Sequence, residues 1–286
     1  MRLPLFAAGL CAAALSVPAF AQDVDTAPLP EVEDTVFAGD FITIGAGVGI
    51  TPSYSGSDDY TFFPVPAAAG TLGGINFRPS GTGLAFDVIP DAEDAQFGFI
   101  AGPVARIRLD RTRRIVDDAV EQLGELDTAI ELGGQVGVQY SGIITPFDTL
   151  SVTLDAVWDV AGAYNGRMIR PTVSFLTPVS RGTAIALSVN AEHVDDDFAD
   201  YYYSSSPSGA LASGLPVFQA EGGFQSVGAN ALFTYDLNGD LTDGGFAVFV
   251  LAGYSRLLGD AKHSPITSIR GSANQFLGGI GLGYTF

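Results

Sequence analysis

Apolar and polar residues alternate along most of the chain. Between Thr149 and Trp158 the even positions are apolar and the odd positions are mainly polar, and residues 41–50, 131–141 and 225–237 repeat this pattern. Strands of soluble proteins are usually about 5–6 residues long, whereas a tilted strand that crosses a bilayer needs about 9–11. Runs of this length and period predict an all-β fold, an antiparallel transmembrane β-barrel.

The alternation and its interruptions predict about twelve strands, with short periplasmic turns and long outer loops. The predicted strands are 41–50, 63–72, 74–79, 82–89, 97–109, 131–141, 149–158, 167–177, 182–191, 225–237, 245–255 and 274–286. The second to fourth are short and contain Pro64, Pro66 and Pro79, so ten strands is the alternative. If the N-terminus is periplasmic, the long segments near 110–130, 192–224 and 256–273 are outer loops. The turns near 142–148, 178–181 and 238–244 are then periplasmic, and this asymmetry is typical of outer-membrane barrels.

The N-terminus has the pattern of an export signal. Met1 and Arg2 precede an apolar stretch, and Ala19-Phe20-Ala21 fits the small-x-small cleavage rule, so we expect a signal peptide over 1–21. Residues 22–40 are acidic and contain prolines, which predicts a flexible periplasmic tail ahead of a barrel over 41–286. Cleavage would remove Cys11, the only cysteine, so no disulfide would stabilise the mature chain.

Composition excludes several classes of protein. The chain has 286 residues with 32 acidic and 13 basic side chains, a net charge of −19, and 47% hydrophobic residues. This hydrophobicity excludes general disorder, and the scarcity of cations argues against nucleic acid as a partner. Beyond the N-terminus no apolar run reaches the roughly 20 residues of a membrane-spanning helix. Most acidic residues fall in the predicted tail, loops and turns, so the charge describes two solvated ends around a nearly neutral wall.

Charged residues on the polar face of the predicted strands form a candidate lumen set. The set is Arg78, Asp87, Arg106, Arg108, Glu131, Asp155, Arg170 and Asp236. Charges of both signs in one lumen would either form an ion-selective constriction or pair with one another in a plugged barrel. Small inward positions at Gly279, Gly281 and Gly283 leave room for water or for an inserted loop.

Histidine, the usual general base, offers little for catalysis. The two histidines, His193 and His263, both fall in predicted outer loops. His193 lies beside Glu192 and the acidic run 195–197, which could activate water or bind a divalent cation. A solvated acidic loop accounts for the same residues more simply. We therefore expect no enzyme activity, no catalytic or metal-binding residues and no cofactor.

The predicted loop over 110–128 contains a basic segment and a short helix. Arg111, Arg113 and Arg114 could bind lipopolysaccharide phosphates or form salt bridges with acidic residues of the same loop. Both interpretations stay open. The aromatic run Tyr201–Tyr203 favours loop packing or an interfacial belt over a ligand platform.

The last strand carries a candidate assembly signal. Aromatic and aliphatic residues occupy every second position up to the C-terminal residue, at Phe276, Ile280, Leu282, Tyr284 and Phe286. This pattern looks like the signal by which the barrel-assembly machinery recognises its clients.

Three blocks of the chain resemble one protein family. They are residues 45–60 (GAGVGITPSYSGSDDY) with Pro64-Val65-Pro66, residues 127–133 (DTAIELG), and residues 253–276 with the segments GYSRLLGDA, SPI and GSANQF. They resemble the MipA/OmpV (MltA-interacting protein) family. The motif residues that we expect at the outer rim are Tyr54, Gly56, Ser57, Asp58, Asp59, Arg256 and Asp260. The loop 110–128 departs from the family by its length and arginine content.

The resemblance implies a non-enzymatic barrel in the outer membrane of a Gram-negative bacterium. It implies a scaffold that brings a murein hydrolase, a lytic transglycosylase, to a murein synthase. The alternatives are a narrow diffusion channel for small solutes and a surface-exposed adhesion or stress-response barrel. Expected partners are outer-membrane lipid and lipopolysaccharide, the barrel-assembly machinery and those periplasmic enzymes, without nucleic acid.

Overall fold

The computed structural model describes residues 35–90, 95–112 and 115–286. It contains twelve strands and several short helices. The strands are β1 (Phe41–Pro52), β2 (Tyr60–Leu72), β3 (Ile75–Ser80), β4 (Gly83–Asp87), β5 (Phe97–Arg108), β6 (Ala129–Ser141), β7 (Thr149–Asp159), β8 (Arg167–Ser180), β9 (Thr183–Val194), β10 (Gly223–Asp236), β11 (Gly245–Leu257) and β12 (Asn274–Thr285). The helices are η2 (Val36–Ala38), α1 (Asp118–Glu121), α2 (Asp196–Tyr203), α3 (Pro207–Ser213), α4 (Gly259–His263) and α5 (Pro265–Ser268). The predicted signal peptide and the start of the predicted tail lie outside the described residues.

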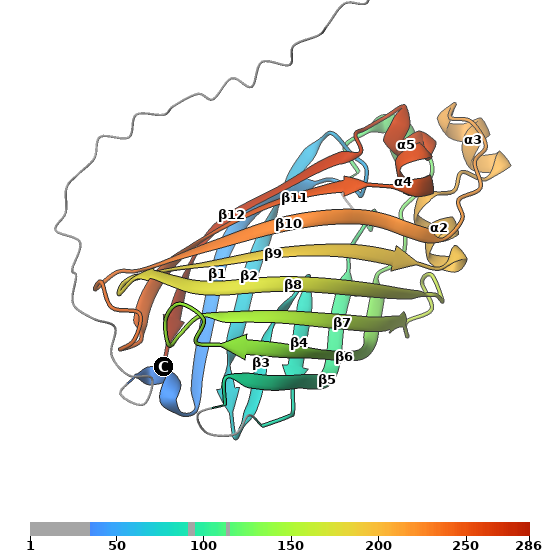
Figure 1. Ribbon diagram of the computed structural model, residues 1–286. Coiled ribbons are helices and arrows are strands. Elements are labelled where there is room, and N and C mark those ends of the chain that lie inside the picture. The colour runs from blue at the N-terminus through green and yellow to red at the C-terminus, as the bar shows by residue number, and fades with distance from the viewer. Residues whose placement is uncertain (1–34, 91–94, 113–114) are drawn as a thin grey trace, which may run out of the picture.

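The strands form one closed antiparallel barrel in which each strand pairs with its neighbours in sequence. β1 closes the barrel on β12, from Thr43 opposite Thr285 to Ile50 opposite Gly278. The prediction of twelve strands is confirmed, and the ten-strand alternative is wrong. In Figure 1 the helices α2–α5 cluster at one end of the barrel, and the short turns and the C-terminus lie at the other. We assign the end with the short turns to the periplasm.

Several strands are longer than their alternation predicts. β2 begins at Tyr60, β9 continues to Val194 and β11 to Leu257. Glu192, His193 and Arg256 therefore belong to the wall and not to outer loops, which corrects their predicted positions. Strand pairing continues past the point where the apolar pattern ends because backbone hydrogen bonds do not depend on side-chain polarity.

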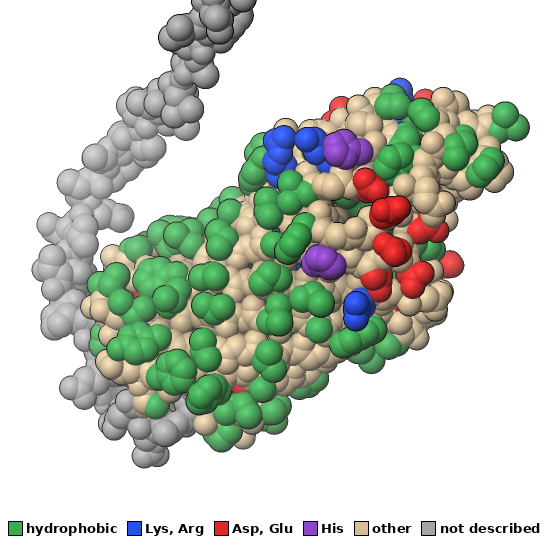
Figure 2. All heavy atoms as spheres, turned by 45° about the vertical axis from the view of Figure 1, so that its right-hand side comes forward, with side chains coloured by type: hydrophobic (Ala, Val, Ile, Leu, Met, Phe, Trp, Pro, Cys, Tyr) green, Lys and Arg blue, Asp and Glu red, His purple; other side chains and the backbone are tan. Residues whose placement is uncertain are grey.

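The outer surface of the wall is apolar, as contact with lipid requires. Outward side chains such as Phe62 and Phe276 are 71% and 56% exposed, and a soluble protein would bury most of them. Figure 2 shows hydrophobic side chains spread over the wall and acidic side chains gathered at its outer end. The wall is therefore the membrane-spanning part.

No helix among the described residues is long and apolar enough to cross a membrane.

Inward glycines of β1 and β12 make room for aromatic rings. A Cβ at Gly281 would lie 2.3 Å from the Phe249 ring, and a Cβ at Gly49 would lie 2.6 Å from the Phe63 ring. At these two positions the space is filled by side chains from neighbouring strands, not by an inserted loop.

Candidate functional site

Three ion pairs lie on the inner face of the barrel. Arg106 of β5 bonds to Asp155 of β7, Arg108 of β5 donates from Nε to Glu131 Oε1 of β6 at 2.6 Å, and Arg170 of β8 bonds to Glu192 of β9. The side chains of Arg106, Glu131 and Asp155 are buried. The three pairs lie along the wall from β5 to β9, and because each pair is neutral they give the outer half of the lumen no field of one sign.

The strand register explains why these side chains meet. Arg106 lies opposite Glu131, and Asp155 lies opposite Arg170, so opposite charges already share cross-strand positions. Arg106 reaches past β6 to Asp155 and also donates from Nη2 to Ser80 Oγ at 2.8 Å. The network thereby ties the β3–β4 hairpin to β5 and β7.

The remaining three predicted lumen charges have other partners. Arg78 Nη2 donates to Gln135 Oε1 at 2.8 Å. Asp87 accepts from the backbone N–H groups of Ile89 and Ala101. Asp236 accepts from the backbone N–H groups of 238, 239 and 240. The two aspartates thus bind backbone N–H groups near the periplasmic end and do not take part in the ion pairs.

Glu192 completes the lumen network, and the sequence analysis placed it in a loop. It shares its parity with Ser188 and Asn190, the inward polar residues of β9. The sequence contained this signal, because extending the alternation of the predicted strand 182–191 by two residues places Glu192 on the inward face.

Aromatic rings cover this network from the outer side. Phe198 and Tyr202 of α2 are buried, and their ring centroids are 4.6 Å apart. The Arg108 guanidinium lies 5.0 Å from the Phe198 centroid and 5.8 Å from that of Tyr202, a cation–π arrangement. Tyr164, from the loop between β7 and β8, packs on Phe198 at 4.9 Å and donates to Glu131 Oε1 at 3.1 Å. This aromatic plug closes the outer mouth above the ion pairs.

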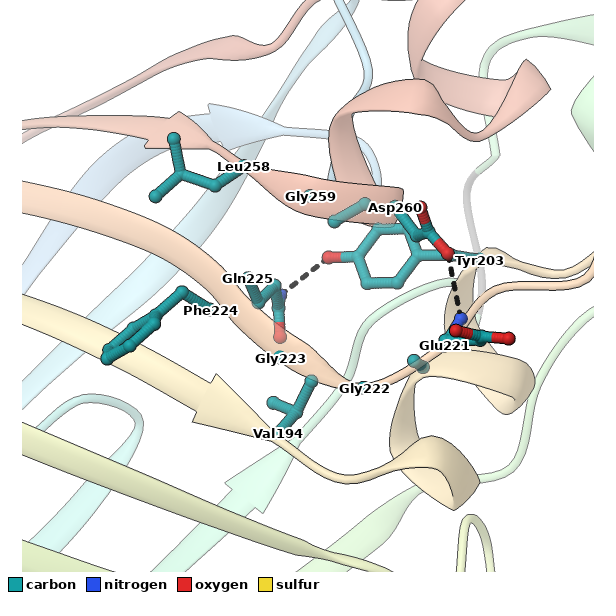
Figure 3. Close-up of a pocket in the computed structure, with 12 residues that line it drawn as sticks. Val194, Tyr203, Glu221, Gly222, Gly223, Phe224, Gln225, Leu258, Gly259 and Asp260 are labelled. Carbon is teal, nitrogen blue, oxygen red and sulfur yellow. Dashed lines mark hydrogen bonds between the residues drawn. The ribbon is translucent and has the colours of Figure 1, made fainter.

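A second layer holds the plug to the wall (Figure 3). Gln225 of β10 donates from Nε2 to the Tyr203 hydroxyl at 2.6 Å, and Glu221 N–H donates to Asp260 Oδ2 at 3.0 Å. Burial raises the pKa of Tyr203, so its hydroxyl stays neutral and forms a 2.7 Å hydrogen bond with Ser55 Oγ. The pocket among these residues has a volume of about 50 Å³, which is room for a few waters and not for a substrate.

The first and last motif blocks meet at the outer rim, although they are more than 200 residues apart in the sequence. The buried Tyr54 hydroxyl donates to the carbonyl oxygens of Ile266 and Arg270 at 3.3 and 3.2 Å. Gly56 N–H donates to Gln275 Oε1 at 3.1 Å, and Ser57 forms a β-bridge with Gly271. Burial raises the pKa of Tyr54.

Glycine is required within the first block. Gly56 has a φ of +104°, and a Cβ there would lie 2.3 Å from Thr267 Oγ1. The motif therefore fixes the β1–β2 loop against α5, above the β1–β12 junction that closes the barrel.

The other motif residues are spread around the rim. Asp58 and Asp59 both lie in the β1–β2 loop. Asp58 is exposed, and the Asp59 N–H donates to Ser57 Oγ. Arg256, predicted to begin the last loop, lies in β11 with its side chain exposed and donates to Asn274 Oδ1 at 2.9 Å. Asp260 begins α4. These residues do not converge on one site.

Arg111 does not face the membrane. It is buried and donates to the carbonyl oxygens of Tyr202 and Gly124, so the interpretation as a lipopolysaccharide ligand is wrong for this residue. Arg113 and Arg114 lie outside the described residues. The predicted loop helix is present as α1, whose N-cap Asp117 is bound by Arg270 at 2.6 Å.

The acidic cluster predicted around His193 is split by the wall. Glu192 faces the lumen, whereas His193 is exposed on the opposite face, where its ring packs edge-on against Phe224 at 5.2 Å. His263 is exposed at the end of α4. Within the described part of the chain, no group of three or more His, Cys, Asp and Glu side chains is arranged to hold a metal ion.

The candidate assembly residues of β12 face outward. Phe276, Ile280, Leu282 and Phe286 are each more than half exposed on the lipid side. Tyr284 packs between Phe246 and Phe286, with centroid distances of 4.7 Å to each ring. Their recognition by the assembly machinery stays a prediction.

Several solved barrels are similar to this chain. They include CymD, a monoaromatic hydrocarbon channel (11% identity, 87% of this chain and 89% of that chain, TM-score 0.41). An outer membrane channel from Pseudomonas putida F1 matches with 11% identity, over 92% and 98% of the two chains, with a TM-score of 0.46. The Pseudomonas putida toluene transporter TodX matches with 10% identity, over 86% and 88%, with a TM-score of 0.34.

A comparison with curated proteins finds no match. The model of the MltA-interacting protein MipA family matches residues 44–286. The chain therefore belongs to the MipA family and is an outer-membrane β-barrel.

Proposed function

We propose that this barrel is a scaffold that does not conduct ions along its axis and that holds murein-remodelling enzymes at its periplasmic end. The observation that carries the proposal is the filled outer lumen. Three ion pairs line it from β5 to β9, and the Phe198–Tyr202 plug covers them. A diffusion channel needs a continuous polar path, and buried paired charges under an aromatic plug oppose one. The family name, MltA-interacting protein, supports a lytic transglycosylase as the partner.

The periplasmic end offers a rigid apolar contact for such a partner. In the turn between β6 and β7, Asp148 accepts backbone hydrogen bonds from Ile143, Ile144 and Thr145 at 2.6–2.7 Å. This carboxylate holds the turn in one shape, and Ile144 is 75% exposed on it. A preorganised apolar residue loses little conformational entropy on binding.

Other acidic residues lie at the same end of the barrel. Asp240 and Asp243 lie in the turn after β10, and Asp40 precedes β1 at the same end. Arg181 is paired with Asp240 at 2.7 Å. This end of the barrel therefore fits a partner that presents both an apolar patch and basic residues.

Capture of a purified lytic transglycosylase on the immobilised barrel tests the scaffold. We expect Ile143→Ser/Ile144→Ser to reduce capture at least 5-fold, because the turn keeps its Asp148 bonds but loses its apolar surface. Leu211→Ser is the matched control, since Leu211 is 90% exposed on α3 at the opposite end. Equal capture by an unrelated barrel, or an equal loss with the control, would contradict the proposal.

Planar-bilayer recording separates the scaffold from a diffusion channel. We expect no stable unitary current from the purified barrel. A stable current in the unmodified protein would overturn the non-conducting part of the proposal and favour the channel.

A further inference from the structure

The strand ladders around the β3–β4 hairpin are short, and the one between β2 and β3 leaves most of one edge of β2 unpaired. β1 and β2 pair along their whole length, from Phe41 opposite Thr71 to Pro52 opposite Tyr60. On its other edge β2 pairs with β3 only at Gly70–Phe77, Thr71–Asn76 and Leu72–Ile75. In the described part of the chain, no strand pairs with residues 60–69 on this edge. We call the junction between residues 60–69 of β2 and residues 78–80 of β3 the open seam.

Prolines remove backbone donors from both sides of the open seam. Phe286 N–H donates to Ile42 O at 2.9 Å, so the even residues of β1 direct their backbone groups to β12. Their partners on β2 are also even and direct their backbone groups away from β1, toward β3. Pro64 and Pro66 belong to this set and have no N–H to offer.

The facing strand carries the third proline. Phe77 pairs with Gly70, and Pro79 directs its backbone to the same side two residues later. The next rung would join Ala68 to Pro79, which cannot donate, so the ladder stops there. The prolines also make the edge unsuitable for an added strand, which would need its N–H groups.

The open seam has defined limits. Toward the outside, Ser55 N–H donates to Asp110 Oδ1 at 2.9 Å and joins the loops after β1 and β5. Arg106 holds Ser80 at the tip of the β3–β4 hairpin through Nη2 and Nε, at 2.8 and 3.2 Å. On the lipid side the seam is flanked by Phe62, 71% exposed, and Ile107, 49% exposed.

The open seam separates two unlike halves of the lumen. From β10 through β12 to β2 the inner face is largely apolar, with Phe63, Val65, Leu232, Phe249, Leu251 and Leu277. From β3 to β9 it carries the ion pairs. Leu232 is 37% exposed although it lies on the inward parity of β10, so the inner half of the lumen holds free space.

We propose that the open seam is a lateral entrance through which single-chain amphiphiles with hydrogen-bond donors, such as alkylamines, pass between the membrane and the lumen. The alkyl chain would lie along Phe63 and Val65, and the polar head would face the charged wall beyond β3. Because Pro64 and Pro66 offer only carbonyl oxygens, the rim accepts hydrogen bonds, and in lipid such acceptors need a donor. A lateral route does not require an axial pore, so this inference is independent of the proposed scaffold.

A lumen tryptophan reports entry. The chain has one tryptophan, Trp158, which is 49% exposed on the lipid side. In a Trp158→Phe background, Leu232→Trp places the fluorophore in the lumen, and the quencher is bromododecylamine loaded into the membrane of proteoliposomes. The parent protein, with Trp158 in the lipid, verifies that the quencher partitions into the membrane.

A reversible lock tests the route. Continuation of the β2–β3 register sets Ala67 against Ser80, so Ala67→Cys/Ser80→Cys would bridge the open seam when oxidised. Ser174→Cys/Ser188→Cys is the matched control, because it bridges inward positions of the continuous β8–β9 ladder. We expect oxidation to slow the initial rate of quenching at least 5-fold across the open seam, reductant to restore it, and the control pair to change nothing.

Three results would overturn the proposal. The first is an unchanged rate of quenching after the lock, and the second is no quenching in the lumen while Trp158 of the parent is quenched. The third is equally fast quenching by bromododecanoate, whose ionised head has no donor, because it would refute the stated ligand class.

Discussion

The pair Arg108–Glu131 holds the plug to the wall, and Arg108→Met tests its contribution to stability. The Glu131 side chain is 1% exposed and accepts from Arg108 Nε at 2.6 Å. Removing one partner of a buried ion pair typically costs about 3–5 kcal/mol, because the other charge stays buried and uncompensated. The cation–π contacts of Arg108 with Phe198 and Tyr202 add about 0.5–1 kcal/mol each. We therefore expect Arg108→Met to lower the free energy of unfolding by about 4–7 kcal/mol.

The double variant Arg108→Met/Glu131→Gln separates charge from packing. It removes both charges and keeps a similar volume, so only the cation–π loss of about 1–2 kcal/mol should remain. The assay is urea unfolding of the barrel in detergent micelles, followed by the mobility difference between folded and unfolded barrel on a gel. A single-variant loss below about 1 kcal/mol, or a double variant no more stable than Arg108→Met, would refute the reasoning.

Three further predictions concern the turn, the plug and the open seam. Burial would raise the pKa of Asp148, but the N–H groups of 143–145 outweigh it and lower that pKa. The turn is therefore stabilised above the unfolded-state pKa of about 4 and loses this stabilisation as pH falls through the lower folded-state value. Protection of the turn amides against hydrogen exchange should fall only in acid, whereas in Asp148→Asn it should already be low at neutral pH. Equal protection in the parent protein and in Asp148→Asn at neutral pH would contradict this. Tyr203→Phe leaves Gln225 Nε2 without its acceptor at a cost of about 1–3 kcal/mol, so proteolysis of the outer loops should accelerate, while Tyr201→Phe, at the exposed bond to Asp127, should change it little. Pro79→Ala returns a donor opposite Ala68 and should slow quenching in the lumen by the membrane-loaded amine; an unchanged rate would mean that this rung does not form.

The wall was predictable because its signal is local. Each strand alternates between lipid and lumen, and a period of two is visible in any window of about ten residues. Thr149–Trp158 is the clearest example, and the structure forms β7 there. Strand ends were less predictable. Arg256 occupies an outward position that breaks the apolar pattern of β11, and Glu192 follows the end of the predicted ninth strand.

The lumen site was predictable in its members and not in its pairs. Parity selected Arg106, Arg108, Asp155 and Arg170 as inward charges. Which carboxylate each arginine meets depends on register and shear, and neither is encoded in a single strand. The plug was still less accessible, because α2 packs against Arg108 through contacts between residues about 90 positions apart.

Pro64, Pro66 and Pro79 show how register changes the meaning of a residue. In the sequence they weakened the evidence for the second to fourth strands. In the structure the strands form. The same three prolines face one junction, where each lacks the N–H group that another residue would offer to the facing strand. A backbone hydrogen bond contributes a net of about 0.5–1.5 kcal/mol, so a junction with three residue pairs is several kcal/mol weaker than the β1–β2 junction with twelve. The β4–β5 junction also has three residue pairs, but Val88 N–H continues it to Ala101 O at 2.9 Å, whereas prolines stop the β2–β3 ladder. We therefore expect any lateral opening of this barrel to begin between β2 and β3, where the apolar half of the lumen meets the charged half.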